Sequence, residues 1–234
     1  MNVAIVMPYY NERELLVKAI KGILKQTYTN WHLFLIDDGS DYYYRAHQVL
    51  DFLAIDPSKV TYVYKSNGGV STARNTALKL IRDCDPYEYV AYCDGDDVWD
   101  EDYLEKQIQS FTDSIDMLYS SVRHRFTDGS VATPFGIADY PEYPGLQTLL
   151  KGNFIFISGV IHRCKCLQVG EFDANLNGIE DWDFWVRIAQ KYNIAKNPNA
   201  CFTYTVKASG NGAKGRAVYD LFYKKHAVHN NTNS

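Results

Sequence analysis

Residues 89–97 have the sequence YVAYCDGDD, a short apolar run that ends abruptly in three carboxylates. Such a run is typical of a buried strand, which here would deliver acidic side chains to the carboxyl edge of a sheet. Carboxylate oxygens are the ligands that Mg²⁺ and Mn²⁺ prefer, and these ions in turn bind diphosphates. An Asp-Gly turn with an aspartate that caps a following helix explains the same residues. The cluster alone therefore leaves a metal site and a capped turn as equal alternatives.

Three earlier apolar runs indicate that this segment belongs to a sheet. The runs cover residues 3–7, 31–36 and 60–64, and helical patterns between the four runs cover residues 15–24, 49–53 and 73–81. Strands and helices that alternate in this way imply right-handed crossovers and a mainly parallel sheet. Ligands of such sheets bind beyond the carboxyl ends of the strands. We therefore expect the four strand ends to meet in one crevice.

The alternation breaks after residue 97. Strand-like runs cover residues 115–122, 153–161 and 200–206, helical patterns cover 181–192 and 217–226, and a Gly/Pro-containing loop covers 126–145. We expect one α/β domain over residues 1–228, with a Rossmann-like sheet flanked by helices. Its two halves would be residues 1–97 and 98–228, and a polar tail would cover residues 229–234.

Composition limits the possible classes of protein. The chain has 234 residues, of which 46% are hydrophobic, so it can bury one large core. A formal net charge of −4 argues against a nucleic-acid partner, which would favour a basic face. The five cysteines form no CxxC pair and indicate reduced thiols, not a zinc site. The sequence shows no signal peptide and no transmembrane run, so we expect a cytoplasmic protein.

Polar residues follow each of the other three expected strands. Pro8, Tyr10 and Asn11 follow the first strand, in a turn where Asn11 could instead cap the next helix. Asp38 follows the second strand as one of two adjacent carboxylates, which repel each other unless a cation or a donor lies between them. A glycine-bearing turn follows the third strand and leads to Arg74, a pattern that suits an anion. Each signal also fits an ordinary turn.

Taken together and in order, these segments resemble the family 2 glycosyltransferases, which have the GT-A fold. The resemblance extends from about residue 3 to residue 189 and is carried by residues 6–11, 35–40, 67–75, 92–97, 169–173 and 180–185. It implies an inverting transfer of a sugar from a nucleotide-sugar, most often a UDP-sugar, to an acceptor hydroxyl. It also implies a divalent metal, Mn²⁺ or Mg²⁺, and a donor half at residues 1–97 with an acceptor half at 98–228.

The resemblance also assigns roles to residues. It implies that Asp38 contacts the nucleotide base beside the turn of Pro8, Tyr10 and Asn11, and that Arg74 faces the base and the diphosphate. Asp94 would face the ribose and Asp96 would bind the metal, which leaves Asp97 as a helix cap. Asp181 matches the general base of the family. Lys207 stands roughly where many relatives carry a histidine near the metal.

The chemistry supports the assignment of Asp181. A carboxylate must take the proton of the acceptor hydroxyl as that oxygen attacks the anomeric carbon, on the face opposite the leaving diphosphate. The dipole of the helix that starts here should keep Asp181 ionised. For Glu180 and Asp183, the preference of acidic residues for the first turn of a helix is a sufficient explanation.

Several alternatives stay open at this stage. The glycine-rich loop from Lys207 to Arg216 is either a lid over the diphosphate or a solvated loop. The acceptor is a saccharide, a lipid-linked sugar, a protein or a small molecule, and a lipid-linked acceptor would require docking at the inner membrane face. A sugar-nucleotide pyrophosphorylase and a non-catalytic saccharide- or nucleotide-binding module are the alternative functions.

Overall fold

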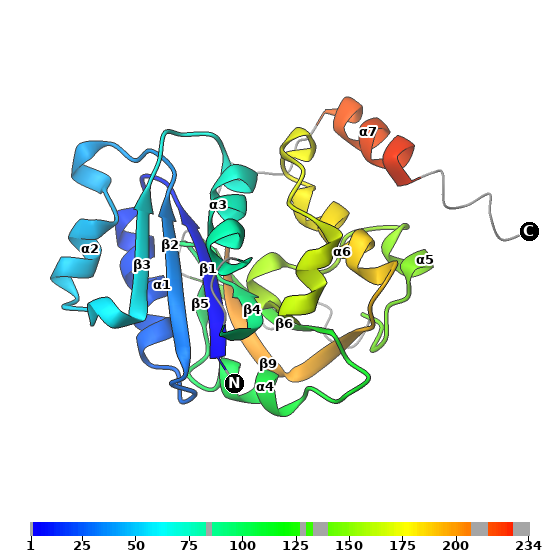
Figure 1. Ribbon diagram of the computed structural model, residues 1–234, viewed down its shortest axis with the longest axis horizontal. Helices are drawn as coiled ribbons and strands as arrows, with labels where there is room; N and C mark the ends of the chain where they lie inside the picture. The colour runs from blue at the N-terminus through cyan, green and yellow to red at the C-terminus, as the bar shows by residue number, and fades with distance from the viewer. Residues whose placement is uncertain (1, 83–85, 127–129, 133–139, 207–214, 227–234) are drawn as a thin grey trace, which may run out of the picture.

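The protein folds around one curled sheet with helices on both faces (Figure 1). A computed structural model describes residues 2–82, 86–126, 130–132, 140–206 and 215–226. Within these residues the sheet has nine strands, and eight of them follow the order β3-β2-β1-β4-β8-β6-β9-β5. The ninth strand, β7, pairs with β6.

The first four strands form the parallel half of the sheet. These strands are β1 (Asn2–Tyr9), β2 (Trp31–Asp37), β3 (Val60–Tyr64) and β4 (Tyr87–Tyr92). The helices between them are α1 (Arg13–Leu24), α2 (His47–Phe52) and α3 (Val70–Arg82). All three strand pairs of this half are parallel, so the predicted strand ends do lie along one edge.

The second half makes the sheet mixed. Its strands are β5 (Val98–Trp99), β6 (Met117–Phe126), β7 (Val131–Ala132), β8 (Val160–Arg163) and β9 (Ile194–Val206). β8 runs antiparallel to both β4 and β6, whereas β6 and β9 are parallel. The strand expected at residues 153–161 is wrong for most of its length, because a 3₁₀ turn at Ile157–Gly159 precedes β8. The expected strand at residues 200–206 begins six residues earlier, at Ile194.

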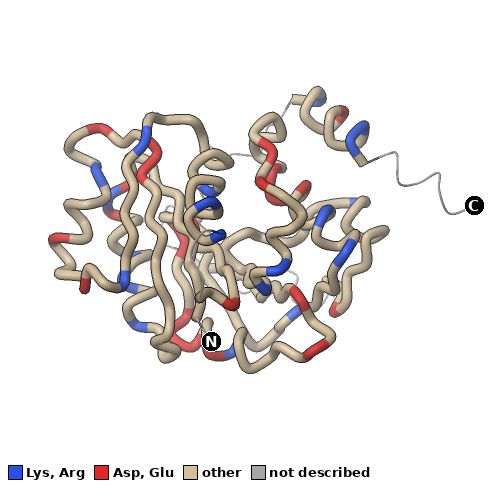
Figure 2. Tube along the Cα trace, in the orientation of Figure 1, with Lys and Arg blue, Asp and Glu red and all other residues tan. Residues whose placement is uncertain are grey.

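The remaining helices surround the second half. They are α4 (Tyr103–Gln109), α5 (Leu146–Leu149), α6 (Glu180–Ala189) and α7 (Arg216–His226), with short 3₁₀ turns at Tyr42–Tyr44, Pro57–Lys59, Cys164–Val169 and Ala174–Leu176. No helix in these described ranges is both long and apolar enough to cross a membrane. Basic and acidic positions are interspersed along the trace in Figure 2, as the nearly balanced charge implies.

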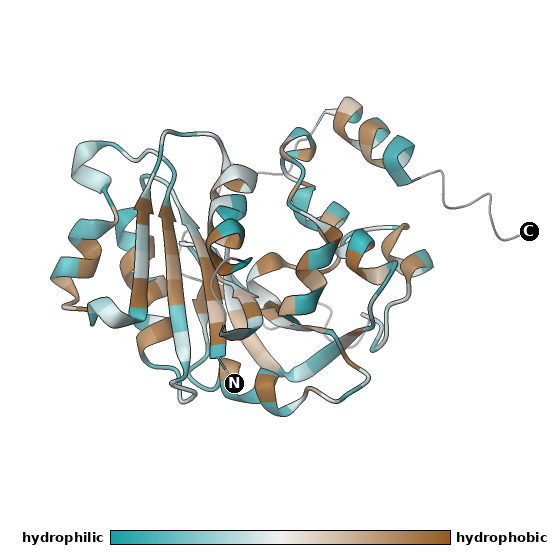
Figure 3. Cartoon of the chain, viewed as in Figure 1, coloured by the Kyte–Doolittle hydropathy of each residue, from teal (hydrophilic) through white to brown (hydrophobic). Residues whose placement is uncertain are grey.

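The core lies on both faces of the sheet. Alternate residues of β1 point to opposite faces, so Val3, Ile5 and Met7 pack with α1 and α4, while Ala4 and Val6 pack with α3 and α6. All five side chains are fully buried, as expected for a central parallel strand that is covered twice. Figure 3 accordingly shows hydrophobic residues in brown through much of β1 and β2.

Helix α7 is attached to α6 by both apolar and charged contacts. The Trp182 ring stacks on Phe222 with centroids 4.1 Å apart. Beside it, the fully buried Asp183 accepts hydrogen bonds from Arg187 and His226 and pairs with Lys225. Burial alone would raise the pKa of Asp183, but these partners outweigh it and lower the pKa to about 2. A preference for the first helical turn is therefore an incomplete explanation of Asp183, which holds α7 in place.

Candidate active site

The four strand ends meet at two adjoining pockets, as the sequence predicts. The strand-end pocket has a volume of about 270 Å³ and is lined by Pro8, Tyr9, Tyr10, Glu12, Asp38, Val70, Ala73, Asp94, Gly95 and Asp96. The helix-end pocket has a volume of about 510 Å³, and its lining includes Arg74, Asn153, Phe156, Asp181 and Tyr204. Both pockets are bordered by Val70 and Asp94. Asp94 therefore lies where the two spaces join.

Asp38, at the end of β2, is held by donors from the third strand end. Its carboxylate accepts hydrogen bonds from the backbone N–H groups of Gly68 and Gly69, the latter at 2.7 Å, and pairs with the Lys65 ammonium. Gly69 has a φ of 87°, which favours glycine in this turn. The glycine turn, which the sequence predicts to be an anion site, thus binds the carboxylate of Asp38. Asp38 is only 4% exposed, and it lines the strand-end pocket.

The neighbouring Asp37 has its own set of donors. Its carboxylate accepts hydrogen bonds from the backbone N–H groups of Ser40 at 2.9 Å and Ala46 at 2.8 Å, and from the Tyr62 hydroxyl at 3.3 Å. The expected repulsion between the two carboxylates is therefore relieved by separate sets of donors, which at Asp38 include the Lys65 ammonium. Asp37 shapes the turn, and Asp38 faces the pocket.

The turn after β1 forms one rim of the strand-end pocket. Tyr10 is 51% exposed there, and Pro8 lies beside it. Asn11 has a φ of 56°, and its side chain exchanges hydrogen bonds with Asp41, accepting from the backbone N–H at 2.8 Å and donating to the carboxylate at 3.3 Å. Asn11 does not cap α1, whose N-cap residue is Glu12. Asn11 thus stabilises the rim through Asp41 and does not line the strand-end pocket.

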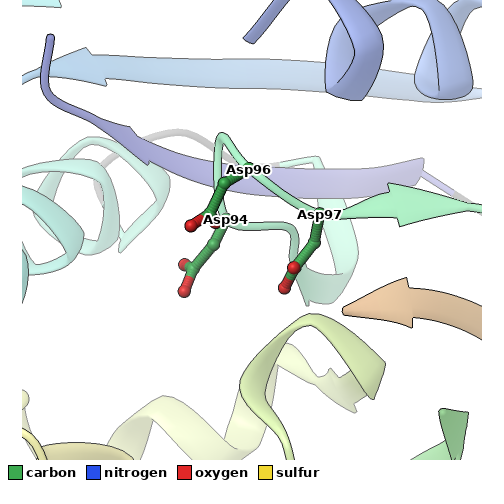
Figure 4. A group of neighbouring side chains, drawn as sticks. All are labelled: Asp94, Asp96 and Asp97. Carbon is green, nitrogen blue, oxygen red and sulfur yellow. The ribbon is translucent and has the colours of Figure 1, made fainter. Parts of the chain in front are cut away.

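Three carboxylates gather directly after β4 (Figure 4). Ligand atoms of Asp94, Asp96 and Asp97 all lie within 4.8 Å of one another. Burial raises the pKa of Asp94 and of Asp97, and the neighbouring negative charges add to this effect. A cation would relieve that cost, and an all-oxygen set suits a hard ion. The residues present therefore fit Mn²⁺ or Mg²⁺.

The prediction that Asp97 caps a helix is wrong. The two-residue strand β5 follows it, and α4 begins only at Tyr103. The Asp97 carboxylate instead accepts a hydrogen bond of 2.9 Å from the backbone N–H of Thr205, at the end of β9. The Thr205 hydroxyl also donates to the backbone carbonyl of Asp96. Thr205, which the sequence did not single out, thus fixes the acidic turn from the far half of the chain.

Arg74 links the acidic turn to the start of α6. Its guanidinium donates to both carboxylate oxygens of Asp94, at 2.9 and 3.0 Å, and to Glu180 Oε1 at 2.8 Å. Arg74 is 2% exposed and Glu180 is 5% exposed. Burial lowers the pKa of Arg74, but the two carboxylates together outweigh it and keep the guanidinium charged.

Glu180 has a larger structural role than a preference for the first helical turn explains. Beyond its place in the first helical turn, it is the second partner of a buried arginine and also accepts a hydrogen bond from the Gly178 backbone N–H. One sequence signal could have revealed this pairing: Arg74 lies on the face of α3 that also carries the buried Ala73, Ala77 and Leu78. An arginine at such a position needs acidic partners inside the protein.

Asp181 lies in the helix-end pocket and has few donors. Its Oδ1 accepts a 2.7 Å hydrogen bond from the Trp182 backbone N–H, and the Asn153 amide donates weakly at 3.3 Å to Oδ1 and 3.4 Å to Oδ2. Burial, aided by the Glu180 charge, raises the pKa of Asp181 to about 7. The shift runs against the effect expected from the helix dipole, because loss of solvation raises the pKa of this carboxylate. Asn153 is a site residue that the sequence did not reveal.

Lys207 and residues 207–214 lie outside the described residues. The lid proposed for the loop from Lys207 to Arg216 therefore remains a prediction.

The other candidate residues, apart from Asn11, line one or both pockets. Pro8, Tyr10 and Asp38 line the strand-end pocket, Arg74 and Asp181 line the helix-end pocket, and Asp94 borders both. Asp96 lies at the strand-end pocket with the acidic cluster.

This architecture is the GT-A fold. Staphylococcus aureus TarS aligns over 98% of this chain with a TM-score of 0.73 and 18% identity. A mannosyltransferase from Pyrobaculum calidifontis, PcManGT, aligns over 97% of the chain with a TM-score of 0.69 and 18% identity. At 18% identity, the likeness shows the fold alone. The aligned regions make up 39% of the TarS chain and 62% of the mannosyltransferase chain.

The chain belongs to glycosyl transferase family 2, whose family model matches residues 4–164. The Escherichia coli enzyme WfgD, a UDP-Glc:alpha-D-GlcNAc-diphosphoundecaprenol beta-1,3-glucosyltransferase, is 36% identical over 82% of this chain and 72% of its own length. The putative colanic acid biosynthesis glycosyl transferase WcaA of E. coli K12 is 26% identical over 81% of this chain and 67% of its own length. The protein is therefore a glycosyltransferase, and the pyrophosphorylase and binding-module alternatives are set aside.

Proposed function

We propose that this enzyme uses a nucleotide-sugar, with a UDP-sugar as the expected donor, and transfers its sugar to an acceptor hydroxyl with inversion and with a divalent metal. The observation that carries the proposal is the position of Asp94 between the two pockets. Because of it, an acidic cluster suited to a metal and a carboxylate suited to a base border adjoining pockets that share Asp94.

The strand-end pocket is suited to the nucleotide. Asp38 and Tyr10 both line it, so the carboxylate can accept a hydrogen bond from a base N–H while the aromatic ring covers the base. Relatives support this choice of donor: WfgD is named for UDP-Glc, and TarS has been solved with UDP and with UDP-GlcNAc. PcManGT was solved with GDP-Man and Mn²⁺. The preference for a uridine over a guanosine donor is therefore a separate and more specific part of the proposal.

Asp96, with Asp94 and Asp97 beside it, would hold the metal. When bound, a divalent ion supplies Lewis-acid chemistry that stabilises negative charge on a leaving diphosphate. Arg74 keeps Asp94 in place through its two hydrogen bonds, so its role is to position the acidic turn. We propose that Lys207, directly after β9, adds positive charge on the diphosphate side.

Asp181 would act as the general base at the other end. The Trp182 N–H occupies Oδ1, whereas Oδ2 receives only the long Asn153 contact, so Oδ2 is the oxygen best placed to take a proton. The acceptor O–H bond breaks as its oxygen bonds to the anomeric carbon, and the bond from that carbon to the diphosphate oxygen breaks in the same step. Attack from the Asp181 side, opposite the diphosphate, inverts the anomeric carbon.

A screen of nucleotide sugars for slow hydrolysis tests this function without knowledge of the acceptor. We expect release of UDP from one or more UDP-sugars when Mn²⁺ or Mg²⁺ is present, loss of that release with EDTA, and loss in Asp96→Ala. The variant Asp113→Asn, which changes an exposed carboxylate outside both pockets, is the matched control. Release that is equally fast with EDTA, or release from non-uridine donors only, would contradict the proposal.

A further inference from the structure

The helix-end pocket has an aromatic wall that the transfer chemistry itself does not require. From this wall and from the charges around it, we infer that the acceptor is an uncharged pyranoside whose ring stacks on Tyr204, with Phe156 packed beside it. The inference rests on the proposed function, because it names the substrate class of the same pocket. Whether the acceptor is a saccharide, a lipid-linked sugar or a small molecule, the group that reacts would be a neutral pyranose ring, and a protein side chain would be excluded.

The two rings are held as a rigid surface. Tyr204 comes from β9 and Phe156 from the segment before β8, and their ring centroids are 5.2 Å apart at 56°. The His124 ring, from β6, packs edge-on against both, at 5.7 Å from Phe156 and 5.8 Å from Tyr204. Both aromatic rings are half-buried and line the pocket, so each retains surface for a ligand.

A pyranose ring is complementary to such a wall. Its C–H faces carry slight positive charge, whereas the face of an aromatic ring is negative, and stacking also removes apolar surface from water. Tyrosine and phenylalanine have few rotatable bonds, so the wall loses little conformational freedom when it binds. A flexible peptide or an acyl chain would not use the flat faces in this way.

The charges of the pocket disfavour an anionic acceptor. Asp94, Glu180 and Asp181 contribute carboxylates to its lining, and Arg74 is the single cation among the described residues that line it. That guanidinium is already bound to Asp94 and Glu180. A phosphate or a uronate would therefore meet uncompensated negative charge. Any diphosphate on a lipid-linked acceptor must lie outside this pocket, beyond the reacting sugar.

Hydrogen-bonding groups in the same lining suit hydroxyls. Asn153 and Asn177 present amides beside Asp181, and an amide can both donate to and accept from a sugar hydroxyl. The long contacts of Asn153 to Asp181 can shorten or shift as a hydroxyl approaches Oδ2. One sugar face can thus lie on Tyr204 while one hydroxyl reaches the base.

Saturation-transfer NMR tests the inference directly. The probes are neutral methyl pyranosides (gluco, galacto, manno and 2-acetamido-gluco), with a glucuronide and a hexose 1-phosphate as anionic counterparts, added to the enzyme with UDP and Mn²⁺. We expect saturation transfer to the ring C–H protons of at least one neutral pyranoside and a dissociation constant at least tenfold weaker, in order of magnitude, for the anions. Tyr204→Leu should weaken neutral binding by about tenfold, whereas Tyr204→Phe, which keeps the ring, should stay within about twofold.

Controls separate this inference from folding and from the proposed function. Phe156→Leu gives a second variant of the wall, Tyr43→Leu changes an aromatic residue that is 76% exposed outside the pocket, and thermal unfolding checks each variant. Equal binding by Tyr204→Leu, tighter binding of the anions, or no neutral pyranoside bound by the wild type would overturn the inference. Tyr204-dependent binding without release of nucleotide from any donor would instead overturn the proposed function and leave the stacking site standing.

Discussion

Asp38 and Asp181 are carboxylates in adjoining pockets, yet their oxygens are satisfied to very different degrees. Asp38 is bound by two glycine N–H groups and a lysine ammonium. Asp181 has one strong donor, Trp182, and two long contacts from Asn153. A carboxylate with many donors is a fixed negative charge, whereas a poorly solvated one binds protons readily. The difference is consistent with the roles proposed for them, Asp38 as a recognition group and Asp181 as a base.

The two pockets also differ in how they are built. The strand-end pocket is formed by turns that follow successive parallel strands, each close in sequence to its strand. The helix-end pocket combines the start of α6, the segment before β8 and the end of β9, which are distant in sequence. Arg74 joins them, because it binds Asp94 on one side and Glu180 on the other. Arg74 thus links the acidic turn of the strand-end pocket to the helix start of the helix-end pocket.

The largest expected effect comes from removing the base. Asp181→Asn should lower the rate of sugar transfer by about 10²–10⁴-fold, because the amide cannot take the acceptor proton. Initial rates of nucleotide release with acceptor present measure this loss. Asp113→Asn should keep the wild-type rate, and near-normal turnover by Asp181→Asn would refute the assignment.

Removing the Arg74 side chain, which binds both Asp94 and Glu180, should reduce the stability of the fold. Arg74→Met leaves the buried Glu180 and the half-buried Asp94 without their cation and should lower the free energy of unfolding by about 3 kcal/mol. Urea denaturation followed by tryptophan fluorescence gives this value. The double variant Arg74→Met/Glu180→Gln should recover part of the loss, because it removes one of the unpaired charges. Equal stability of Arg74→Met and wild type would show that the ion pairs of Arg74 contribute nothing to the free energy of unfolding.

A change at Asp38 should weaken nucleotide binding. Asp38→Asn replaces the charged acceptor of the Gly68 and Gly69 N–H groups, and we expect UDP to bind roughly tenfold more weakly, about 1.4 kcal/mol. Calorimetric titration of UDP in Mn²⁺ measures the change. Asp51→Asn, at an exposed position on α2, is the control. Unchanged affinity in Asp38→Asn would remove Asp38 from the nucleotide site.

The raised pKa of Asp181, about 7, predicts two pH effects of opposite sign. Transfer should rise with pH through this value, because only the ionised base accepts the proton. Stability should move the other way, since a raised carboxylate pKa costs stability as pH rises from its unfolded value through its folded one. Asp181→Asn should therefore be more stable than wild type at about pH 8 by roughly 1 kcal/mol, a value discounted for partial exposure, and nearly equal at about pH 4. Thermal unfolding at both pH values tests this, and a destabilised variant at pH 8 would contradict it.

The strand-end pocket could be predicted from sequence because its determinants are local. Apolar runs that alternate with amphipathic helices fix the parallel half-sheet, and the polar residues after each run must then share one edge. The acidic turn, Asp38 and the rim at Pro8 and Tyr10 all lie where that logic places them.

The helix-end pocket could be predicted only in part, because its determinants are distant in sequence. Glu180 meets Arg74 across 106 residues, and Asp97 meets Thr205 across 108. No local pattern in α6 or in the acidic turn shows these partners. The apolar residues before β8 also suggested a strand, whereas the 3₁₀ turn in that segment contributes buried side chains to the core. The pKa of Asp181 depends on burial by both halves, which the helix dipole alone does not capture.

The most direct test of the central claim, that metal and base act at separate ends of one site, is calorimetric titration of UDP with and without Mn²⁺. We expect Mn²⁺-dependent UDP binding by wild type, the same affinity within about twofold for Asp181→Asn, and loss of the Mn²⁺ dependence in Asp96→Ala. UDP binding by wild type that is indifferent to Mn²⁺, or loss of the dependence in Asp181→Asn as well, would contradict the account.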